Sequence, residues 1–476
     1  MGGSREQAVP DAGGGEPMAM EPRIARPSVE IFPPEPAPVA VSSGGGLSAT
    51  AEEFDAKEEV EAEKEDYQVV SVFYGTDRMP TDMGQSERRG YLGWLYLSAS
   101  CAVITLALIV AAYRLTRRLP LLLLAGTGVA ATLVFGAITT LSRFPGEPVG
   151  PRPDWTYGDE RGELEMGICK VSIPEHHQMG AIERPSVFRF ELREDPREHI
   201  VVLALEEQPA DTFFAGLRER VEASPRKEAF VFVHGFNTTF DEAAYRTAQL
   251  AHDLKFEGAP IFFSWPSQGG LLEYAIDETN VVWAVPHLKD FLIDVARRSG
   301  ANSVHLVAHS MGNRALTSAL QLLSYELRDE PPMFREVVLT APDVDAEVFR
   351  RDIVPAIVPT AGRVTLYASS NDEALKLSKA LHGYRRAGDS GGELLVISGV
   401  DTVDVSTVDT SLLGHEYYGN NQTVIADMLD LINESKPPHL RRFLEAKRMG
   451  ELFYWVFHGD PQMLGTSQPA EPSVRR

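Results

Sequence analysis

Ser310 stands in a sequence context that is typical of a catalytic nucleophile. It lies at the centre of Ala308-His309-Ser310-Met311-Gly312, between the apolar run Val304–Val307 and a helical pattern over Asn313–Leu323. Small residues occupy the positions two before and two after the serine, as they must where a strand and a helix backbone nearly touch. The pattern predicts a nucleophile elbow, a tight turn that lifts the serine hydroxyl out of a sheet to where a base can reach it.

An acid and a histidine follow in the chain order of α/β-hydrolases, which is serine, then acid, then histidine. Three strand candidates come after the elbow helix: Arg335–Ala341, Arg363–Ser369 and Thr402–Ser406. The second is followed by Asp372, and the third leads into a loop that carries His415. Because functional side chains in open α/β sheets lie at the carboxyl ends of strands, we predict Asp372 as the orienting carboxylate and His415 as the general base.

Other residues compete for these two roles. Asp343 and Asp345 follow the preceding strand and are alternative acids, although Asp345 also suits the N-cap of a helix that begins at Ala346. The competing histidines lie in a helix-like run, beside the elbow, or in the loop after an earlier strand: His382, His305, His309 and His234. We expect the two beside the elbow to pack or line the site, and the loop histidine to serve structure.

A tetrahedral intermediate also needs two preorganised backbone N–H donors. In α/β-hydrolases one comes from the residue after the nucleophile and the other from the loop after an early strand. These positions are Met311 and Phe236, the latter in a loop that follows the apolar strand Glu228–Val233. Gly235 leaves that loop free to turn an amide inward. We therefore predict that the amides of Phe236 and Met311 form the oxyanion hole.

From Phe230 to Leu431 the chain resembles a bacterial family of α/β-hydrolases of unknown function, described as esterase- or lipase-like and formerly filed as a domain of unknown function. The resemblance rests on Phe232–Asn237, Phe263–Gly269, Ala308–Arg314, Ala341–Asp345, Leu366–Leu375 and Gly414–Tyr418. Two upstream segments are similar to the opening strands of the family, Val69–Arg78 and Gly162–Pro174. The resemblance implies a triad of Ser310, Asp372 and His415, and it implies no particular substrate.

The elements around these residues alternate between strand and helix. Strand patterns lie at Ile200–Leu205, Phe230–Val233, Ile261–Ser264, Val304–Val307, Val337–Thr340, Val364–Tyr367 and Val403–Val405. Helical patterns lie at Asp241–Leu254, Tyr274–Ser299, Asn313–Tyr325, Asn421–Ile432 and His439–Phe457. The alternation predicts an α/β-hydrolase fold with a doubly wound, mostly parallel sheet. We expect the last helix to pack on the domain or to lie at a membrane interface, and Gly269–Thr279 is a candidate lid.

Two apolar stretches interrupt the family pattern, at Gly90–Tyr113 and Leu119–Ser142. Neither contains a charged residue, and at ~1.5 Å rise per residue each is long enough to cross a ~30 Å hydrocarbon core. Soluble core helices usually carry polar residues on one face, and these stretches do not. We therefore predict that residues 90–142 form a transmembrane hairpin, in preference to a pair of buried core helices or a signal peptide.

A hairpin returns the chain to the side of the membrane that it left. The short loop between the two stretches holds Arg114, Arg117 and Arg118. The near flanks hold more arginines: Arg78, Arg88, Arg89, Arg143, Arg152 and Arg161. Because an excess of positive charge marks the cytoplasmic side, we expect a catalytic domain that faces the cytoplasm, with the loop arginines as the opposing signal.

Composition excludes several classes of protein. The chain has 476 residues and a formal net charge of −23, which argues against a nucleic-acid partner, since phosphate binding requires clustered Lys and Arg. Its two cysteines make no disulfide framework, and the sequence lacks the Cys/His spacing of a metal site. We therefore expect no cofactor and no metal.

We divide the chain into a disordered tail (1–66), a first strand segment (67–89), the hairpin (90–142), a catalytic domain (143–434) and a C-terminal helix and tail (435–476). The tail is rich in Pro, Gly and Ala and then in acidic residues, so it buries too little apolar surface to fold. We expect a membrane-anchored serine hydrolase acting on a small-molecule or lipid-like carboxylic ester. The alternatives are a non-catalytic, membrane-tethered hydrolase scaffold for protein interaction, and an acyltransferase.

Overall fold

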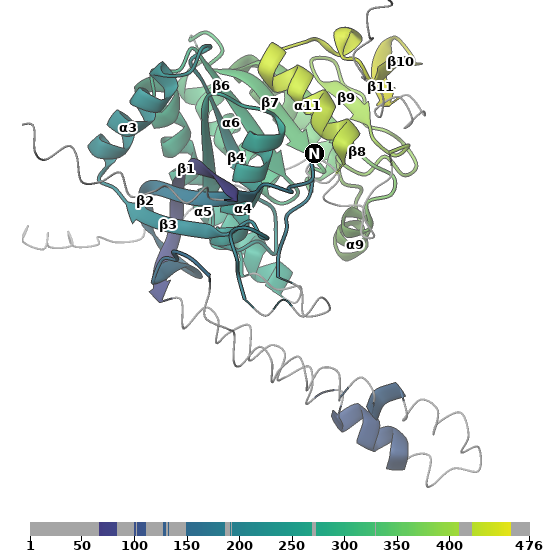
Figure 1. The fold of residues 1–476 in the computed structure, drawn as a ribbon. Coiled ribbons are helices and arrows are strands. Elements are labelled where there is room, and N and C mark those ends of the chain that lie inside the picture. Colours follow the sequence, from purple (N-terminus) through teal and green to yellow (C-terminus); the bar gives the residue numbers. More distant parts are fainter. Residues whose placement is uncertain are drawn as a thin grey trace, which may run out of the picture. The chain divides into compact units, whose positions relative to one another are not determined.

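The structure is a computed structural model that describes residues 66–82, 100, 102–110, 127–129, 132, 149–185, 191, 193–268, 273–328, 330–408 and 421–457. The predicted disordered tail lies outside these residues except for Asp66, as does most of the predicted hairpin. Figure 1 shows a twisted sheet with helices on both of its faces.

The described residues form one sheet of eleven strands, in the order β10-β11-β9-β8-β7-β6-β4-β5-β1-β2-β3. The strands are β1 (Tyr67–Asp82), β2 (Trp155–Pro174), β3 (Val202–Glu207), β4 (Glu228–Val233), β5 (Ala259–Ser264), β6 (Ser303–His309), β7 (Phe334–Thr340), β8 (Ala361–Ala368), β9 (Asp401–Asp404), β10 (Leu444–Met449) and β11 (Leu452–Phe457). Three neighbouring pairs among these strands are antiparallel: β1–β2, β2–β3 and β10–β11. All the other neighbouring pairs are parallel. The prediction of a mostly parallel sheet is confirmed.

The central strands are buried along most of their length because helices cover them on both faces. All six residues of β4, for example, are buried. Helices α3 (Ala210–Glu222), α5 (Tyr274–Arg298) and α6 (Gly312–Glu326) pack on one face of the sheet through side chains such as Leu217, Leu288 and Leu316. Helices α4 (Phe240–Asp253) and α11 (Gln422–Glu434) pack on the other through Leu250 and Met428. The sheet is therefore doubly wound.

Further helical segments follow the later strands. They are α7 (Ala346–Val348), a π-helical turn (Phe349–Ile353), α8 (Val354–Ile357), a 3₁₀ turn (Val358–Thr360), α9 (Glu373–His382) and a second 3₁₀ turn (Pro438–Leu440). The helices α4, α5, α6 and α11 begin and end within two residues of the predicted bounds. The sequence analysis identified no helix at α3.

The insertion leaves the sheet and returns to it at one place. β1 and β2 pair antiparallel from Tyr67 and Pro174 to Asp82 and Trp155. The residues that precede and follow the insertion therefore lie side by side, and the domain closes without it.

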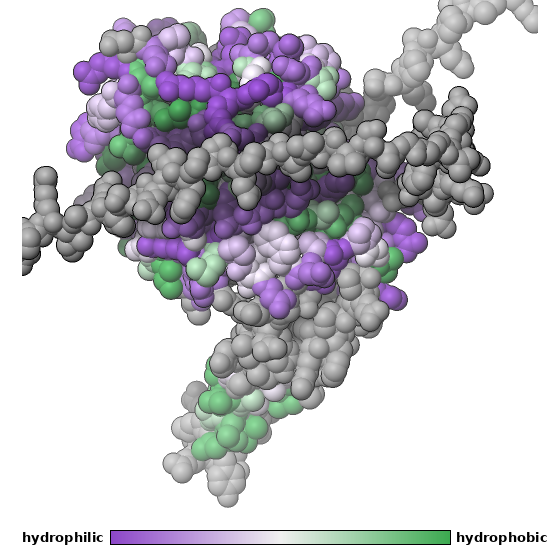
Figure 2. Space-filling model, turned by 90° about the vertical axis from the view of Figure 1, so that its left-hand side faces the viewer, coloured by the Kyte–Doolittle hydropathy of each residue, from purple (hydrophilic) through white to green (hydrophobic). Residues whose placement is uncertain are grey.

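The predicted transmembrane hairpin lies mostly outside the described residues. Among the residues that the structure does describe, none belongs to a helix long and apolar enough to cross a membrane. The described helical residues 102–110 nevertheless expose large apolar side chains: Val103, Ile104, Leu106, Ile109 and Val110. Figure 2 shows this part of the chain as mainly hydrophobic, in contrast to the largely hydrophilic face of the sheet domain in the same view.

The predicted C-terminal helix at His439–Phe457 is wrong. The segment forms the hairpin of β10 and β11, and β11 joins the sheet by parallel pairing with β9 through Trp455 and Val403. Aromatic and β-branched residues dominate β11 and favour a strand, and Gly450 adopts φ +62° in the turn. The domain consequently extends to Phe457, beyond the predicted boundary at 434.

Candidate active site

Ser310 occupies a strained turn between β6 and α6. Its φ of +50° is unusual for a residue other than glycine, and the residue is only 4% exposed. A Cβ on Gly312 would overlap the carbonyl oxygens of Val233 and His234, so only glycine lets α6 start this close to β4. The backbone has the form predicted for a nucleophile elbow.

The turn lies where the strand order of the sheet reverses. β6 and β4 are neighbours, with Ala308 opposite Val233, while the chain continues from β4 to β5 on one side and from β6 to β7 on the other. Ligands of doubly wound sheets bind outside the carboxyl ends of the strands at such a switch point. The elbow and the loop after β4 both lie at this point.

The loop after β4 packs directly against the elbow. A Cβ on Gly235 would lie 3.0 Å from the Cβ of Ser310 and 2.9 Å from the Nδ1 atom of His309. The backbone amides of Phe236 and Met311 have no hydrogen-bond partner among the described residues. Met311 is buried at the start of α6 and Phe236 is half-buried, and two unpaired N–H groups around one serine suit the predicted oxyanion hole.

Several buried groups hold this loop in place. Arg78 on β1 donates to the carbonyl of Thr238 at 2.7 Å and to the hydroxyl of Ser264 at 2.7 Å. Ser267 donates to the carboxylate of Asp277 at 2.6 Å and accepts from the Thr238 amide at 3.3 Å. The strand segment Val69–Arg78 thus supports the loop through Arg78, a role that no local sequence pattern predicted.

His234 serves structure, as predicted. Its ring is buried and stacks on Trp265 with ring centroids 5.0 Å apart. Burial, together with the positive charge of Arg78, holds the pKa of His234 well below its ordinary value. The neutral ring donates from Nδ1 to the carbonyl of Gly235 at 2.7 Å and accepts the Trp265 amide at Nε2 at 3.1 Å.

Asp372 lies at the same edge of the sheet as Ser310. The ends of β6, β7 and β8 are in register, since His309 pairs with Thr340 and Thr340 with Tyr367. Asp372 follows β8, is 1% exposed, and caps α9 by accepting the Leu375 amide at 2.9 Å. Its role as the orienting acid remains a prediction, because its predicted partner His415 lies outside the described residues.

The carboxylates of the two alternative acids, Asp345 and Asp343, form hydrogen bonds and ion pairs of their own. Asp345 caps α7 by accepting the amides of Glu347 and Val348 at 2.9 and 3.0 Å, as its sequence context suggested. Asp343 is 2% exposed and its carboxylate has four partners: Arg314 at 3.1 Å, Arg386 at 3.2 Å, Ser378 at 2.6 Å and Tyr274 at 2.5 Å. None of these partners is a histidine of the described part of the chain, and Asp343 remains an alternative to Asp372.

The electrostatics of Asp343 fit a structural carboxylate. Burial acts to raise its pKa, but the charge of Arg314 and the hydrogen bonds from Ser378 and Tyr274 hold the pKa below its ordinary value. The network reaches the loop after β4, because the Tyr274 ring packs edge-on against Phe236 with centroids 5.2 Å apart. Tyr274 opens α5, so the described part of the candidate lid, from residue 273, is helical from Tyr274 onward.

The competing histidines are held by other partners or buried. His382 contacts the carboxylate of Glu278 at 2.6 Å and the Ser378 carbonyl at 2.7 Å. His305 is fully buried in β6, with no hydrogen bond from its ring nitrogens to a described residue. His309 lines a cavity of about 350 Å³ together with Gly235, Arg184 and Arg246. No pattern in the sequence pointed to Arg184 and Arg246, because they stand 62 positions apart and meet only in the fold.

Comparisons with known proteins find a similarity to α/β-hydrolases over part of this chain. Residues 210–433 match the model of a family described as alpha/beta hydrolase of unknown function (DUF900). No curated protein gives a significant match. The crystal structure of an uncharacterised protein from Capnocytophaga ochracea DSM 7271 is 14% identical, with a TM-score of 0.24; the match covers 45% of this chain and 58% of that one. Over residues 210–433 the chain is thus similar to a family of α/β-hydrolases, in agreement with its doubly wound sheet.

Proposed function

We propose that this protein is a membrane-anchored serine hydrolase that cleaves carboxylic esters through an acyl-enzyme intermediate. The observation that carries the proposal is the conformation of Ser310, with φ +50° in a turn where Gly235 and Gly312 leave no room for a side chain. Backbone strain of this kind costs about 1–3 kcal/mol and is concentrated at functional sites. The similarity to α/β-hydrolases supports the same reading.

In the proposed reaction His415 takes the proton of Ser310 while Oγ attacks the ester carbonyl carbon. Asp372 holds the imidazole in the required tautomer and stabilises its charged form. The amides of Phe236 and Met311 bind the oxyanion. The alcohol leaves with the proton from His415, and water then attacks the acyl-enzyme by the same route, releasing the acid and restoring the serine hydroxyl.

The proposed anchor is the insertion at residues 90–142. Two apolar stretches of membrane-spanning length support it, as do the apolar side chains exposed on residues 102–110. Thr105 and Gly128, one from each stretch, lie so close that a Cβ on the glycine would overlap the threonine side chain. Small residues at a close helix contact are typical of membrane helices. A tethered enzyme of this kind suits lipid-like esters as substrates.

Fluorophosphonate labelling tests the nucleophile. The full chain in detergent should be labelled, and Ser310→Ala and His415→Ala should lose both labelling and turnover of p-nitrophenyl esters. Ser324→Ala is the matched control, because this serine lies on α6 and bonds only to the Gln321 carbonyl at 2.7 Å. A folded wild-type protein that takes no label and cleaves no ester would point to a non-catalytic scaffold. Labelling without hydrolysis, but with transfer to an added alcohol, would point to an acyltransferase.

Membrane fractionation tests the anchor. Because Asp82 and Trp155 are paired neighbours, a short Gly/Ser turn should replace residues 83–154 without opening the sheet. The full chain should resist alkaline extraction from membranes, and the shortened chain should be soluble. Extraction of the full chain by alkali would contradict the anchor. Protease should reach a cytoplasm-facing catalytic domain in inside-out vesicles and not in right-side-out vesicles.

A further inference from the structure

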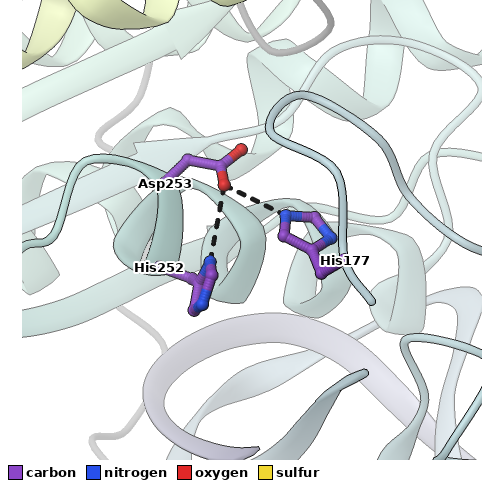
Figure 3. Close-up of side chains that lie close together, drawn as sticks. All are labelled: His177, His252 and Asp253. Carbon is purple, nitrogen blue, oxygen red and sulfur yellow. Dashed lines mark hydrogen bonds and ion pairs between the residues drawn. The ribbon is translucent and has the colours of Figure 1, made fainter. Parts of the chain in front are cut away.

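A second cluster of polar side chains lies at the far end of α4 from the oxyanion loop. It joins His252 and Asp253 in the last turn of α4 to His177, in the connection that follows β2 (Figure 3). The Oδ1 atom of Asp253 lies 3.0 Å from Nε2 of His177 and 3.4 Å from Nδ1 of His252. One ligand atom from each residue lies within 4.8 Å of the others.

Two carboxylates give this cluster negative charge, which favours a bound cation. Asp253 is 2% exposed in the last turn of a helix, where the helix dipole disfavours negative charge. A second carboxylate, Glu183, lies 2.8 Å from Nδ1 of His177. The pocket between these carboxylates therefore attracts positive charge.

Two of the three separations between the proposed ligand atoms fit zinc. Two ligand atoms at ~2.0–2.1 Å from a tetrahedral Zn²⁺ lie about 3.3 Å apart, and the measured separations from Asp253 are 3.0 and 3.4 Å. The second carboxylate oxygen of Asp253 is fixed by the amide of Gly180 at 2.7 Å and by Gln249 at 2.5 Å. The first is thereby left facing the two imidazoles.

The surroundings of His177 match those of a metal ligand. A histidine that binds a metal usually donates its other ring N–H to a carboxylate, which fixes the tautomer and the direction of the free nitrogen. Glu183 stands in this position toward Nδ1, so that Nε2 points to Asp253. His252 is 33% exposed, which leaves a side of the cluster open to water as a fourth ligand.

We propose that His177, His252 and Asp253 bind a zinc ion, with Glu183 as the carboxylate that orients His177. The site does not take part in ester cleavage, because α4 has 14 residues and at ~1.5 Å per residue separates the cluster from the oxyanion loop by about 20 Å. The ion instead clamps the connection after β2 to the end of α4. No metal was expected, because the sequence lacks the Cys/His spacing of a metal site. His177 and Asp253 stand 76 positions apart in the chain.

Metal analysis of the untagged full chain in detergent tests the site. After dialysis against ZnCl₂ and removal of free metal, one zinc per chain should remain, and zinc should raise the melting temperature of the metal-free protein. Co²⁺ in its place should give the intense visible bands of a tetrahedral site. His252→Ala should weaken zinc binding by more than about 100-fold, because outer carboxylates such as Glu183 alone account for about 10–100-fold. Glu183→Gln should fall in that smaller range.

The matched control is His176→Ala. His176 neighbours the cluster in sequence, but its side chain is 52% exposed and contacts only Glu198, at 3.7 Å. The His176→Ala variant should bind zinc as tightly as the wild type. His252→Ala should keep the fold, since His177 still bridges the two carboxylates, and its melting temperature without metal is the check. A wild type that holds no zinc, or that loses none of its affinity in His252→Ala, would overturn the proposal.

Discussion

Arg78 donates a 2.7 Å hydrogen bond to the carbonyl of Thr238, and so ties the strand before the insertion to the loop beside Ser310. The same guanidinium donates to the carbonyls of Gly158 at 2.9 Å and Ser267 at 3.1 Å. It is 1% exposed. A single buried cation thus fixes the ends of several strands around the proposed oxyanion hole.

Replacing Arg78 by lysine should disturb catalysis more than folding. Lysine keeps the charge but lacks the planar fork that reaches several carbonyls at once. We expect kcat for a soluble ester to fall by about 10²-fold, as when a catalytic group is displaced by ~1 Å, with little change in KM. Arg161→Lys is the control, because Arg161 bonds to Asn280 at 2.8 Å and not to the loop. Equal losses in both variants would contradict the positioning role.

Gly235→Ala should damage the oxyanion hole. The added Cβ would lie 3.0 Å from the Cβ of Ser310, so the loop must move away from the elbow. We expect kcat to fall by about 10²–10³-fold, as for loss of an oxyanion donor. Gly216→Ala is the control. Gly216 lies within α3, and the added Cβ would contact only Phe73, at 4.0 Å. That variant should keep full activity and gain up to about 1 kcal/mol of stability.

Asp372→Asn and Asp343→Asn should separate the two candidate acids. Asparagine caps a helix as well as aspartate does, so Asp372→Asn should retain stability and lose on the order of 10⁴-fold in kcat through the wrong histidine tautomer. Asp343→Asn leaves Arg386 without a counter-charge and Arg314 with Glu278 alone, at 2.6 Å, which should cost about 3–5 kcal/mol in unfolding free energy. Denaturant melts and ester kinetics of both variants decide the matter. The reverse pattern would make Asp343 the catalytic acid.

Glu336 should make folding stability depend on pH. Its carboxylate is 2% exposed beside Arg363, 3.2 Å away, and burial raises its pKa from 4.5 to about 7 in spite of that charge. Between these values the folded state holds a proton that the unfolded state has lost. The unfolding free energy therefore falls as pH rises from about 4.5 to 7, and stays lower above 7.

Removing the Glu336 carboxylate should abolish this dependence. Glu336→Gln should be more stable than the wild type at pH 8 by on the order of 2–3 kcal/mol and nearly equal at pH 4.5. In this variant Arg363 still donates hydrogen bonds to the carbonyls of Ser435 and Lys436, at 3.0 and 3.1 Å in the wild type. Urea melts across this pH range measure the effect. Glu326→Gln, at an exposed pair with Lys289, should change stability by less than about 0.5 kcal/mol at either pH.

Patterns of near neighbours predicted much of this fold. The apolar run before Ser310 and the small residues around it predict both the strand and the turn, and β6 and α6 follow as expected. The same pattern failed at His439–Phe457, where apolar residues at helical spacing suggested a helix. The segment forms a strand because the edge of β9 pairs with β11, and that edge is formed by residues far away in the chain.

The sequence by itself determined the order of strands and helices, the elbow at Ser310 and the cap at Asp345, because each depends on residues within a few positions. Only the tertiary structure decided what meets across the sheet. It brought Arg78 under the oxyanion loop, surrounded Asp343 with two arginines, and joined His177 to His252 and Asp253. Such contacts arise from packing between distant segments, and no local spacing records them.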